Sequence, residues 1–291
     1  MRSIISLLLI LTACGSAEKS GPVAPAPALN PIVQVETQPG FVRWISFPIA
    51  KGQEDAQLKC KDQLIKHAPW KEGQRFAYVA ETYFSDMRPY TCVLVLADKK
   101  EVPVAQFTVK PFKYKEEKLK VDYRTVRLSK KDLARAQKEQ RMLAGLYQQS
   151  APLPYFSEAF KAPLDSFITS IYGNRRVYNN DHKSQHLGTD YRAAVGVPIP
   201  AVNRGRVLFA GDLFYTGGTV IIDHGMDIFT VYGHLSEVKT EAGQVVKAGD
   251  IVALSGNTGR SSGPHLHWGV KIHGHYVNGY SLIDETKKQF P

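Results

Sequence analysis

The sequence predicts an all-β protein built from two β domains and a single connecting helix. Short apolar and aromatic runs, such as residues 76–79 and 219–222, recur along the chain and are separated by turn residues. Runs of β-branched and aromatic residues with such boundaries indicate strands. Only residues 129–149 have the spacing of an amphipathic helix. The 291 residues exceed one average domain, and 43% hydrophobic with 22% charged residues is an ordinary globular composition.

The first residues have the pattern of an export signal. Arg2 is followed by the apolar run from Ile4 to Leu11 and then by Thr12-Ala13-Cys14-Gly15. This run is shorter than the ~20 apolar residues that a membrane-spanning helix needs. The cysteine at the cut site resembles a bacterial lipobox, which implies a lipoprotein signal peptide at residues 1–13 and a lipid anchor on Cys14. A plain signal peptide with an incidental cysteine is the alternative.

Residues 14–40 are predicted to form a flexible tether. They are rich in Ser, Gly, Pro, Ala and Asn and contain few large apolar side chains. Such a stretch buries too little surface to offset its chain entropy. The tether would hold the folded part away from the membrane.

Residues 41–113 are predicted to form a small β-sandwich-like domain without chemistry of its own. It contains Cys60 and Cys92, the two cysteines that remain once Cys14 is assigned to lipid. In an exported protein such a pair favours a disulfide. Two buried free thiols are the alternative, because the sequence does not give their separation in space.

Residues 114–155 are predicted to form a linker with one amphipathic helix. Ser129 can cap the helix, and Pro152 and Pro154 follow its end. One face is apolar (Leu133, Ala136, Leu143, Leu146) and the rest is basic (Lys130, Lys131, Arg135, Lys138, Arg141). Such a helix can bind a membrane or an acidic polymer, but we expect it to dock on the neighbouring domain.

Residues 156–291 are predicted to form an antiparallel β domain with almost no room for helices, and three motifs in it point to chemistry. His186-Leu-Gly-Thr-Asp190 places an imidazole and a carboxylate four residues apart, and His265-Leu-His267 places two imidazoles on one face of a strand. His234 follows another predicted strand. Catalytic zinc sites take three protein ligands from His, Asp or Glu and keep a position for water.

The order of these motifs resembles the lysostaphin-type peptidases, the M23 or LytM-domain family. The resemblance covers residues 156–280 and includes Tyr232-Gly-His234-Leu and the stretch from Ser255 to His267. Two approach segments, residues 170–176 and 222–225, are also similar. The family often has an Asp-Pro pair after the final strands, where this chain has Val277-Asn-Gly-Tyr280. This difference lies outside the motifs and affects only the C-terminal edge of the resemblance.

The resemblance implies a complete site. His186, Asp190 and His267 would bind one zinc ion, and His265 and His234 would be catalytic histidines that do not bind metal. We assign His265 as the general base and His234 as the partner of the oxyanion; the reverse assignment stays open. The other histidines receive structural interpretations: His273-Gly-His275 as a surface hairpin, His182 as a solvated loop residue and His224 as a turn residue.

The implied function is a zinc-dependent endopeptidase that cuts the peptide cross-links of peptidoglycan. The family cuts Gly-Gly bridges or the link from D-alanine to diaminopimelate; a lipobox without a recognisable wall-targeting module favours the second bond and a lipid-anchored location in a Gram-negative envelope. Some relatives have lost ligands and act as scaffolds that activate other wall hydrolases. That is the alternative, although all five positions are filled here.

Charge adds two expectations about partners. The formal net charge of +10 favours an anionic partner, such as a membrane surface or the acidic polymers of the wall. The chain lacks an RNP-like, zinc-finger or helix-turn-helix signature, so we expect no nucleic-acid partner. Because residues 41–150 precede the predicted catalytic domain and are basic in part, we expect them to limit activity or select substrate, for example by an autoinhibitory contact.

Overall fold

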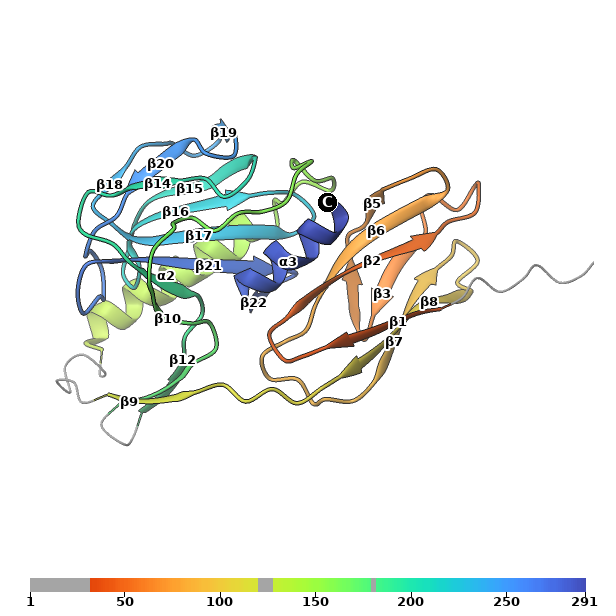
Figure 1. The fold of residues 1–291 in the computed structure, drawn as a ribbon, viewed down its shortest axis with the longest axis horizontal. Coiled ribbons are helices and arrows are strands. Elements are labelled where there is room, and N and C mark those ends of the chain that lie inside the picture. The colour runs from red at the N-terminus through yellow and green to blue at the C-terminus, as the bar shows by residue number, and fades with distance from the viewer. Residues whose placement is uncertain (1–31, 120–127, 179–181) are drawn as a thin grey trace, which may run out of the picture. The chain divides into compact units, whose positions relative to one another are not determined.

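The computed structural model describes residues 32–119, 128–178 and 182–291 (Figure 1). The predicted signal peptide and the predicted lipidation site, Cys14, lie outside the described residues. The described residues cluster in one compact unit. They are mostly strands, and strand pairing is antiparallel except between β1 and β8 and between β9 and β11. The predicted all-β class is therefore confirmed.

The N-terminal half packs two sheets against each other. One sheet has the order β1 (Val33–Thr37), β8 (Glu101–Val109), β7 (Tyr90–Val95), β3 (Gln57–Cys60) and β4 (Gln63–Ile65). The other has the order β2 (Val42–Pro48), β6 (Gln74–Ala80) and β5 (Ala68–Pro69). Buried side chains from both, such as Phe47 and Val79 from the small sheet with Leu58 and Phe107 from the large one, form a shared core.

Strand β1 corrects the predicted tether. Residues 33–37 pair in parallel with residues 105–109 of β8, so the described end of the 14–40 segment is part of the sheet. Composition predicted a coil here. The segment forms a strand despite its low apolar content. Its backbone groups form hydrogen bonds with the edge of β8, and Val35 packs against the core.

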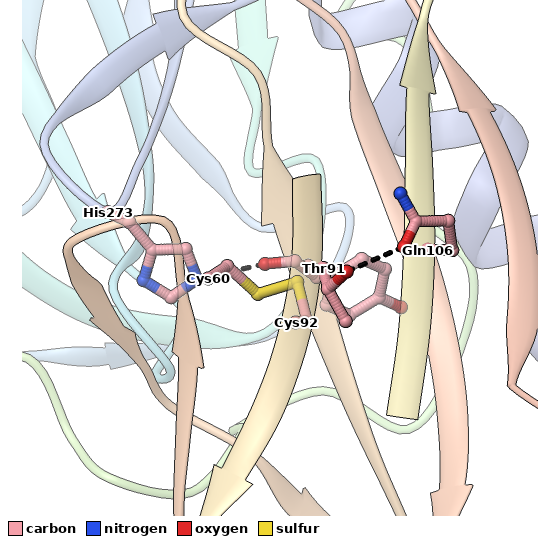
Figure 2. Close-up of a disulfide and its surroundings, with 6 residues drawn as sticks. Cys60, Thr91, Cys92, Gln106 and His273 are labelled. Atoms are coloured by element: carbon pink, nitrogen blue, oxygen red, sulfur yellow. Dashed lines mark hydrogen bonds between the residues drawn. A yellow bond between two sulfur atoms is a disulfide. The ribbon is translucent and has the colours of Figure 1, made fainter. Parts of the chain in front are cut away.

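A disulfide joins the two strands β3 and β7 (Figure 2). Cys60 and Cys92 face each other in the register of the two strands, and both are buried. Figure 2 shows Thr91 and Gln106 beside the bridge, linked by a hydrogen bond of 2.6 Å from the threonine hydroxyl to the glutamine carbonyl. The bridge fixes the β3–β4 hairpin, whose Gln63 side chain reaches the C-terminal half by donating to the carbonyl of His273.

Helix α2 (Lys130–Tyr147) docks on the C-terminal half, as expected. The Ser129 hydroxyl accepts a hydrogen bond from the backbone N–H of Asp132 and caps the first turn. Leu143, Leu146 and Tyr147 pack on the sheet, on the face that carries Leu208, Ile221, Phe229 and Val231. Leu133 is exposed, so the buried stripe is confined to Ala136 and the second half of the helix. Among the described helices, none combines the length and the apolar character that crossing a membrane requires.

The C-terminal half is built around one large sheet. Its order is β10 (Ile168–Ser170), β13 (Thr189–Arg192), β21 (His265–Ile272), β17 (Ile228–Leu235), β16 (Gly217–Asp223), β15 (Gly205–Leu213) and β19 (Val245–Val246), with β22 (His275–Val277) also pairing with β21. Two three-stranded sheets flank it. One comprises β14 (Pro198–Pro200), β20 (Ile251–Leu254) and β18 (Glu237–Val238); the other comprises β12 (His182–Gln185), β11 (Arg175–Tyr178) and β9 (Glu116–Leu119).

A second helix, α3 (Gly279–Gln289), corrects the expectation of a domain without room for helices. The Asn278 side chain caps it, and Leu282 and Ile283 are buried in the main core. Its polar side chains also bond to β2: the Ser281 hydroxyl accepts from the N–H of Val42, and the Glu285 carboxylate accepts from the N–H of Trp44. The helix therefore satisfies the edge of β2 while it covers the core.

The turn at His273 corrects a second expectation. Residues 273–274 connect β21 and β22 as a hairpin, but His273 is buried rather than on the surface. Its Nε2 bonds to the carbonyl of Tyr78, 2.9 Å away, and its ring faces Asp227. The N-terminal half covers this turn, which a local reading of the sequence does not reveal.

Candidate metal centre and active site

The first three candidate residues converge on one point of the large sheet. Asp190 on β13 and His267 on β21 are paired in the strand register, and His186 lies just before β13. Asp190 Oδ1 is 2.9 Å from His186 Nε2 and 2.8 Å from His267 Nδ1, and the two nitrogens are 3.3 Å apart. Among the described residues this is the group of His, Asp, Glu or Cys side chains close enough to hold a metal ion.

These distances fit a small divalent ion. With zinc–ligand bonds of about 2.0–2.1 Å, two donor atoms in a tetrahedral site lie about 3.3 Å apart. The three donors, two imidazole nitrogens and one carboxylate oxygen, are already at nearly that separation. Burial raises the pKa of Asp190, but hydrogen bonds and charge from His186 and His267 outweigh burial and hold that pKa well below its usual range. The carboxylate is therefore ionised and able to bind a cation.

Neighbouring polar groups orient the donors. The carbonyl of Ile171 lies 2.9 Å from His186 Nδ1 and so holds the ring with Nε2 facing the centre. The Arg176 guanidinium donates to Asp190 Oδ2 at 3.2 Å, which leaves Oδ1 to face the two imidazoles. A Cβ at Gly188 would lie 2.5 Å from the carbonyl of Trp268 and 2.7 Å from His267 Cε1. The glycine in the first motif is therefore required by the close approach of His267.

The two remaining candidate histidines lie beside this centre. His265 Nε2 is 3.7 Å from Asp190 Oδ1, and the His234 ring centroid is 4.6 Å from that of His265 and 5.9 Å from that of His267. His265 Nδ1 donates to the carbonyl of Gly263 and His234 Nδ1 donates to that of Thr258, both at 2.8 Å. In its neutral form each ring would therefore keep the proton on Nδ1 and present Nε2 as an acceptor.

His234 is held by its backbone as well as by its ring. Its φ of +62° is in the left-handed region, which is uncommon outside glycine and costs roughly 1–3 kcal/mol. The N–H of His234 donates to the carbonyl of Thr216 at 2.6 Å, and the strand register shifts between Gly218 and Val220 opposite. Burial lowers the pKa of His234 to about 4, so the ring is neutral at pH 7.

Two residues that support the predicted ligands carry no motif in the sequence that assigns them a role. Arg176 lies in the approach segment at residues 170–176. Glu117 lies in the predicted linker, yet its carboxylate accepts from Asn174 Nδ2 at 2.6 Å and pairs with Arg176 at 3.4 Å. No local motif marks Glu117; its position depends on the pairing of β9 with β11.

The other singled-out residues are outside the centre. His224 is fully buried, with Nδ1 donating to the carbonyl of Arg204 and Nε2 near the Thr230 hydroxyl. His182 begins β12, and its side chain is outside the described part of the chain. Cys60 and Cys92 are in the N-terminal half.

The fold and the cluster thus define a β domain with a candidate metal centre and two further imidazoles beside it. Residues 184–279 match the model of Peptidase family M23. Peptidoglycan DD-endopeptidase ShyA of Vibrio cholerae is 38% identical over 119 residues, which are 40% of this chain and 28% of that protein. DD-carboxypeptidase/endopeptidase Mpg of Neisseria meningitidis is 39% identical over 101 residues, 35% of this chain and 23% of that protein. The chain therefore carries a peptidase M23 domain.

One solved structure resembles a larger part of the chain. A Pseudomonas aeruginosa protein assigned to peptidase M23 matches 88% of this chain and 97% of its own, with a TM-score of 0.64 and 24% identity. This likeness shows a common fold that includes the N-terminal half. By contrast, the matches to ShyA and Mpg span less than a third of those proteins.

Proposed function

We propose that the protein is a zinc-dependent endopeptidase that hydrolyses the peptide cross-links of peptidoglycan. The observation that carries the proposal is the convergence of His186, Asp190 and His267 beside two imidazoles whose Nε2 atoms are free to accept a proton. The name of ShyA, a peptidoglycan DD-endopeptidase, supports peptidoglycan as the substrate. The term DD in the names of ShyA and Mpg supports a bond between two D-configured centres, and the D-alanine to diaminopimelate link is such a bond. Cell-wall remodelling is the role that would follow from its cleavage.

In this proposal His186 Nε2, Asp190 Oδ1 and His267 Nδ1 hold the ion. When bound by these residues, a zinc ion would supply Lewis acidity for the scissile carbonyl and would lower the pKa of bound water towards neutral pH. Arg176 fixes Asp190, and the carbonyl of Ile171 fixes His186, so the donors need little rearrangement. The sheet supplies the rigid frame.

The two remaining histidines move protons. We propose His265 as the general base, because its Nε2 is an acceptor beside Asp190 and its side chain is partly exposed. His234 can stabilise the developing oxyanion only after its Nε2 gains a proton. The low pKa of His234 opposes that protonation in the free protein. The reverse assignment, with His234 as the base, is therefore the alternative to test.

A catalytically silent scaffold that activates another wall hydrolase is the second candidate. Such a scaffold would share the fold. It would not need the imidazoles of His265 and His234 beside a complete set of three metal ligands. The test is digestion of purified cross-linked peptidoglycan by protein without residues 1–20, with and without a chelator. Conversion of dimeric muropeptides to monomers only when metal is present supports the endopeptidase, whereas a folded, zinc-loaded protein that cuts nothing supports the scaffold.

We also propose a lipid-anchored location in the cell envelope, at the outer membrane or periplasm of a Gram-negative cell. The support is the lipobox-like stretch that ends at Cys14. In cells, labelled fatty acid should enter the wild-type protein and be absent from a Cys14→Ser variant, which should leave the membrane fraction. Membrane association that survives this change would contradict the proposal.

We further propose that residues 41–150 limit the activity or select the substrate. In support, Lys66 pairs with Asp227 at 2.8 Å and Gln63 bonds to the carbonyl of His273, so this part contacts the peptidase domain directly. A full-length variant with Lys66→Ala and Gln63→Ala should cut faster or accept more muropeptides. An unchanged rate and product range would contradict the proposal.

A further inference from the structure

The segment that leaves the N-terminal domain runs beside the metal centre. Strand β9 adds to the edge of β11 in parallel, with Glu117 opposite Arg176 in the register. The N–H of Arg175 donates to the carbonyl of Lys115 at 2.8 Å at the start of this pairing. The pairing places Glu117, a residue of the predicted linker, beside Arg176. Arg176 is two residues after Asn174, whose backbone carbonyl bonds to His186.

An aromatic contact fixes the start of β9. Tyr114 packs over Gly173, whose φ of +85° favours glycine and where a Cβ would lie 2.2 Å from Tyr114 Cε1. The Tyr114 hydroxyl donates to the carbonyl of Pro39, and the Tyr83 hydroxyl donates to the carbonyl of Gly173. Tyr83 from the N-terminal half and Tyr114 from the segment that follows it therefore hold the turn that precedes β11.

Glu117 connects to the first ligand through Asn174. The Asn174 amide donates to Glu117 Oε1 at 2.6 Å, and the Asn174 carbonyl accepts from the N–H of His186 at 2.9 Å. The N–H of Gly173 donates to the carbonyl of His186 at 2.8 Å, so the turn and the ligand are bonded in both directions. Glu117 thus anchors the side chain of the residue that holds the His186 backbone.

Glu117 connects to the second ligand through Arg176. Arg176 Nε pairs with Glu117 Oε2 at 3.4 Å, and Arg176 Nη2 donates to Asp190 Oδ2 and to the Ser170 hydroxyl, both at 3.2 Å. The Arg176 and Glu117 side chains are about a quarter and a third exposed, at 24% and 31%, while that of Asp190 is 9% exposed. The Arg176 guanidinium therefore links the partly exposed carboxylate of Glu117 to the buried carboxylate of Asp190.

The balance of charge around Asp190 gives a reason for having both Arg176 and Glu117 beside it. A guanidinium bonded to Asp190 steers one carboxylate oxygen away from the ion, but its positive charge also opposes a nearby divalent cation. Glu117 offsets that charge and keeps Arg176 in place. Removal of Glu117 would leave Arg176 to compete with the metal for Asp190.

We propose that Glu117 and Arg176 are positioning residues for the metal centre, and that the segment following the N-terminal half thereby contributes to metal binding. The inference rests on the proposed zinc function and adds that the peptidase domain is completed by a residue from the predicted linker. A chain without residues 41–150 also lacks Glu117, so weaker zinc binding accompanies any gain in access to the site.

The test compares Glu117→Gln with the matched control Glu116→Gln in otherwise intact protein without residues 1–20. Glu116 is the exposed neighbour on the same strand, so the change in net charge is identical. Zinc affinity is measured by competition with a chromophoric chelator, and the visible spectrum of the cobalt-substituted protein reports the donor geometry. Changes to outer contacts of a metal site weaken binding by about 10- to 100-fold, and we expect this for Glu117→Gln and none for Glu116→Gln.

Variants of Arg176 separate positioning from general loss of structure. Arg176→Met should weaken zinc binding and change the cobalt spectrum, Arg176→Lys should recover part of the affinity, and Glu117→Gln should add little to Arg176→Met. Melting of the metal-free proteins checks that all are folded. Equal zinc affinity and spectra in Glu117→Gln and Glu116→Gln would overturn the inference.

These outcomes are independent of substrate cleavage. If the wild type binds zinc and cuts no peptidoglycan, the proposed function fails while a weakened Glu117→Gln still supports the positioning role. If the wild type binds no zinc, both the function and the positioning role are overturned.

Discussion

Asp190 and His267 are directly opposite each other on β13 and β21, with Asp190 Oδ1 2.8 Å from His267 Nδ1. Two donors of the candidate metal centre are thus set by the register of a sheet rather than by loop conformation. A shift of one residue in either strand would turn one of them to the opposite face. We therefore expect the site to tolerate little change in its backbone.

Loss of the carboxylate should abolish metal binding. Asp190→Asn keeps the shape of the side chain but removes the charge that draws the cation and that pairs with Arg176. We expect zinc affinity to fall by more than about 100-fold, beyond the range for outer contacts. Isothermal titration with zinc measures it, and affinity within a few-fold of wild type would show that Asp190 is not a ligand.

The glycine of the first motif should be intolerant of any side chain. In Gly188→Ala the new Cβ would meet the Trp268 carbonyl and the His267 ring, so we expect a loss of roughly 1–3 kcal/mol in stability together with weaker zinc binding. Gly145→Ala is the control, because that helical glycine has open space around it and alanine is the better helix former. Chemical denaturation measures the free energy of unfolding of both variants. Equal stability of Gly188→Ala and Gly145→Ala would argue against the close approach of His267 and Trp268 to Gly188.

The disulfide should stabilise the fold without affecting the metal centre. Cys60 and Cys92 are 32 residues apart, and closing a loop of that size contributes about 3–4 kcal/mol in the chain-entropy model. A Cys60→Ala, Cys92→Ala double variant should therefore unfold at lower denaturant concentration while its zinc affinity stays at the wild-type value. A drop in zinc affinity at concentrations where the protein is folded would contradict this separation.

Acid should weaken the fold through His224. Burial lowers the pKa of His224 from an ordinary 6.5 to about 4, so between these values the unfolded chain binds the proton that the folded chain excludes. The contribution to stability is complete above pH 6.5 and is lost as pH falls through 4, by roughly 3 kcal/mol in total.

The variant His224→Asn isolates the contribution of His224 to the pH dependence of stability. His224→Asn keeps a donor for the carbonyl of Arg204 and removes the titration. The slope of unfolding free energy against pH, measured from 6.5 to 4, should be smaller in the variant by about 1.4 kcal/mol per pH unit. Identical slopes would show that His224 takes up its proton at an ordinary pKa.

The proximity of the three predicted ligands could be expected from the sequence because they lie in compact motifs. His186 and Asp190 are four residues apart, and His265 and His267 are two apart on one strand, so local geometry alone brings each pair to one side. The predicted linker helix also docks as expected, because its apolar residues repeat over several turns.

The features that the sequence does not reveal depend on partners far along the chain. Strand β1 has a low apolar content and is ordered by pairing with β8. Helix α3 is short and polar, and its burial of Ser281 and Glu285 is compensated by the backbone of β2. The position of Glu117 likewise follows from its pairing with Arg176, which no spacing rule predicts.

The most direct test of the account is cleavage of a dimeric muropeptide cross-linked from D-alanine to diaminopimelate. Zinc-loaded wild type is compared with His265→Ala and with His275→Ala, a change in the other His-x-His motif, which lies after β21. The account predicts monomeric products from the wild type and His275→Ala, and a rate at least about 100-fold lower from His265→Ala, as expected for loss of a general base. An intact dimer after incubation with folded, zinc-loaded wild type, or equal rates for all three proteins, would contradict it.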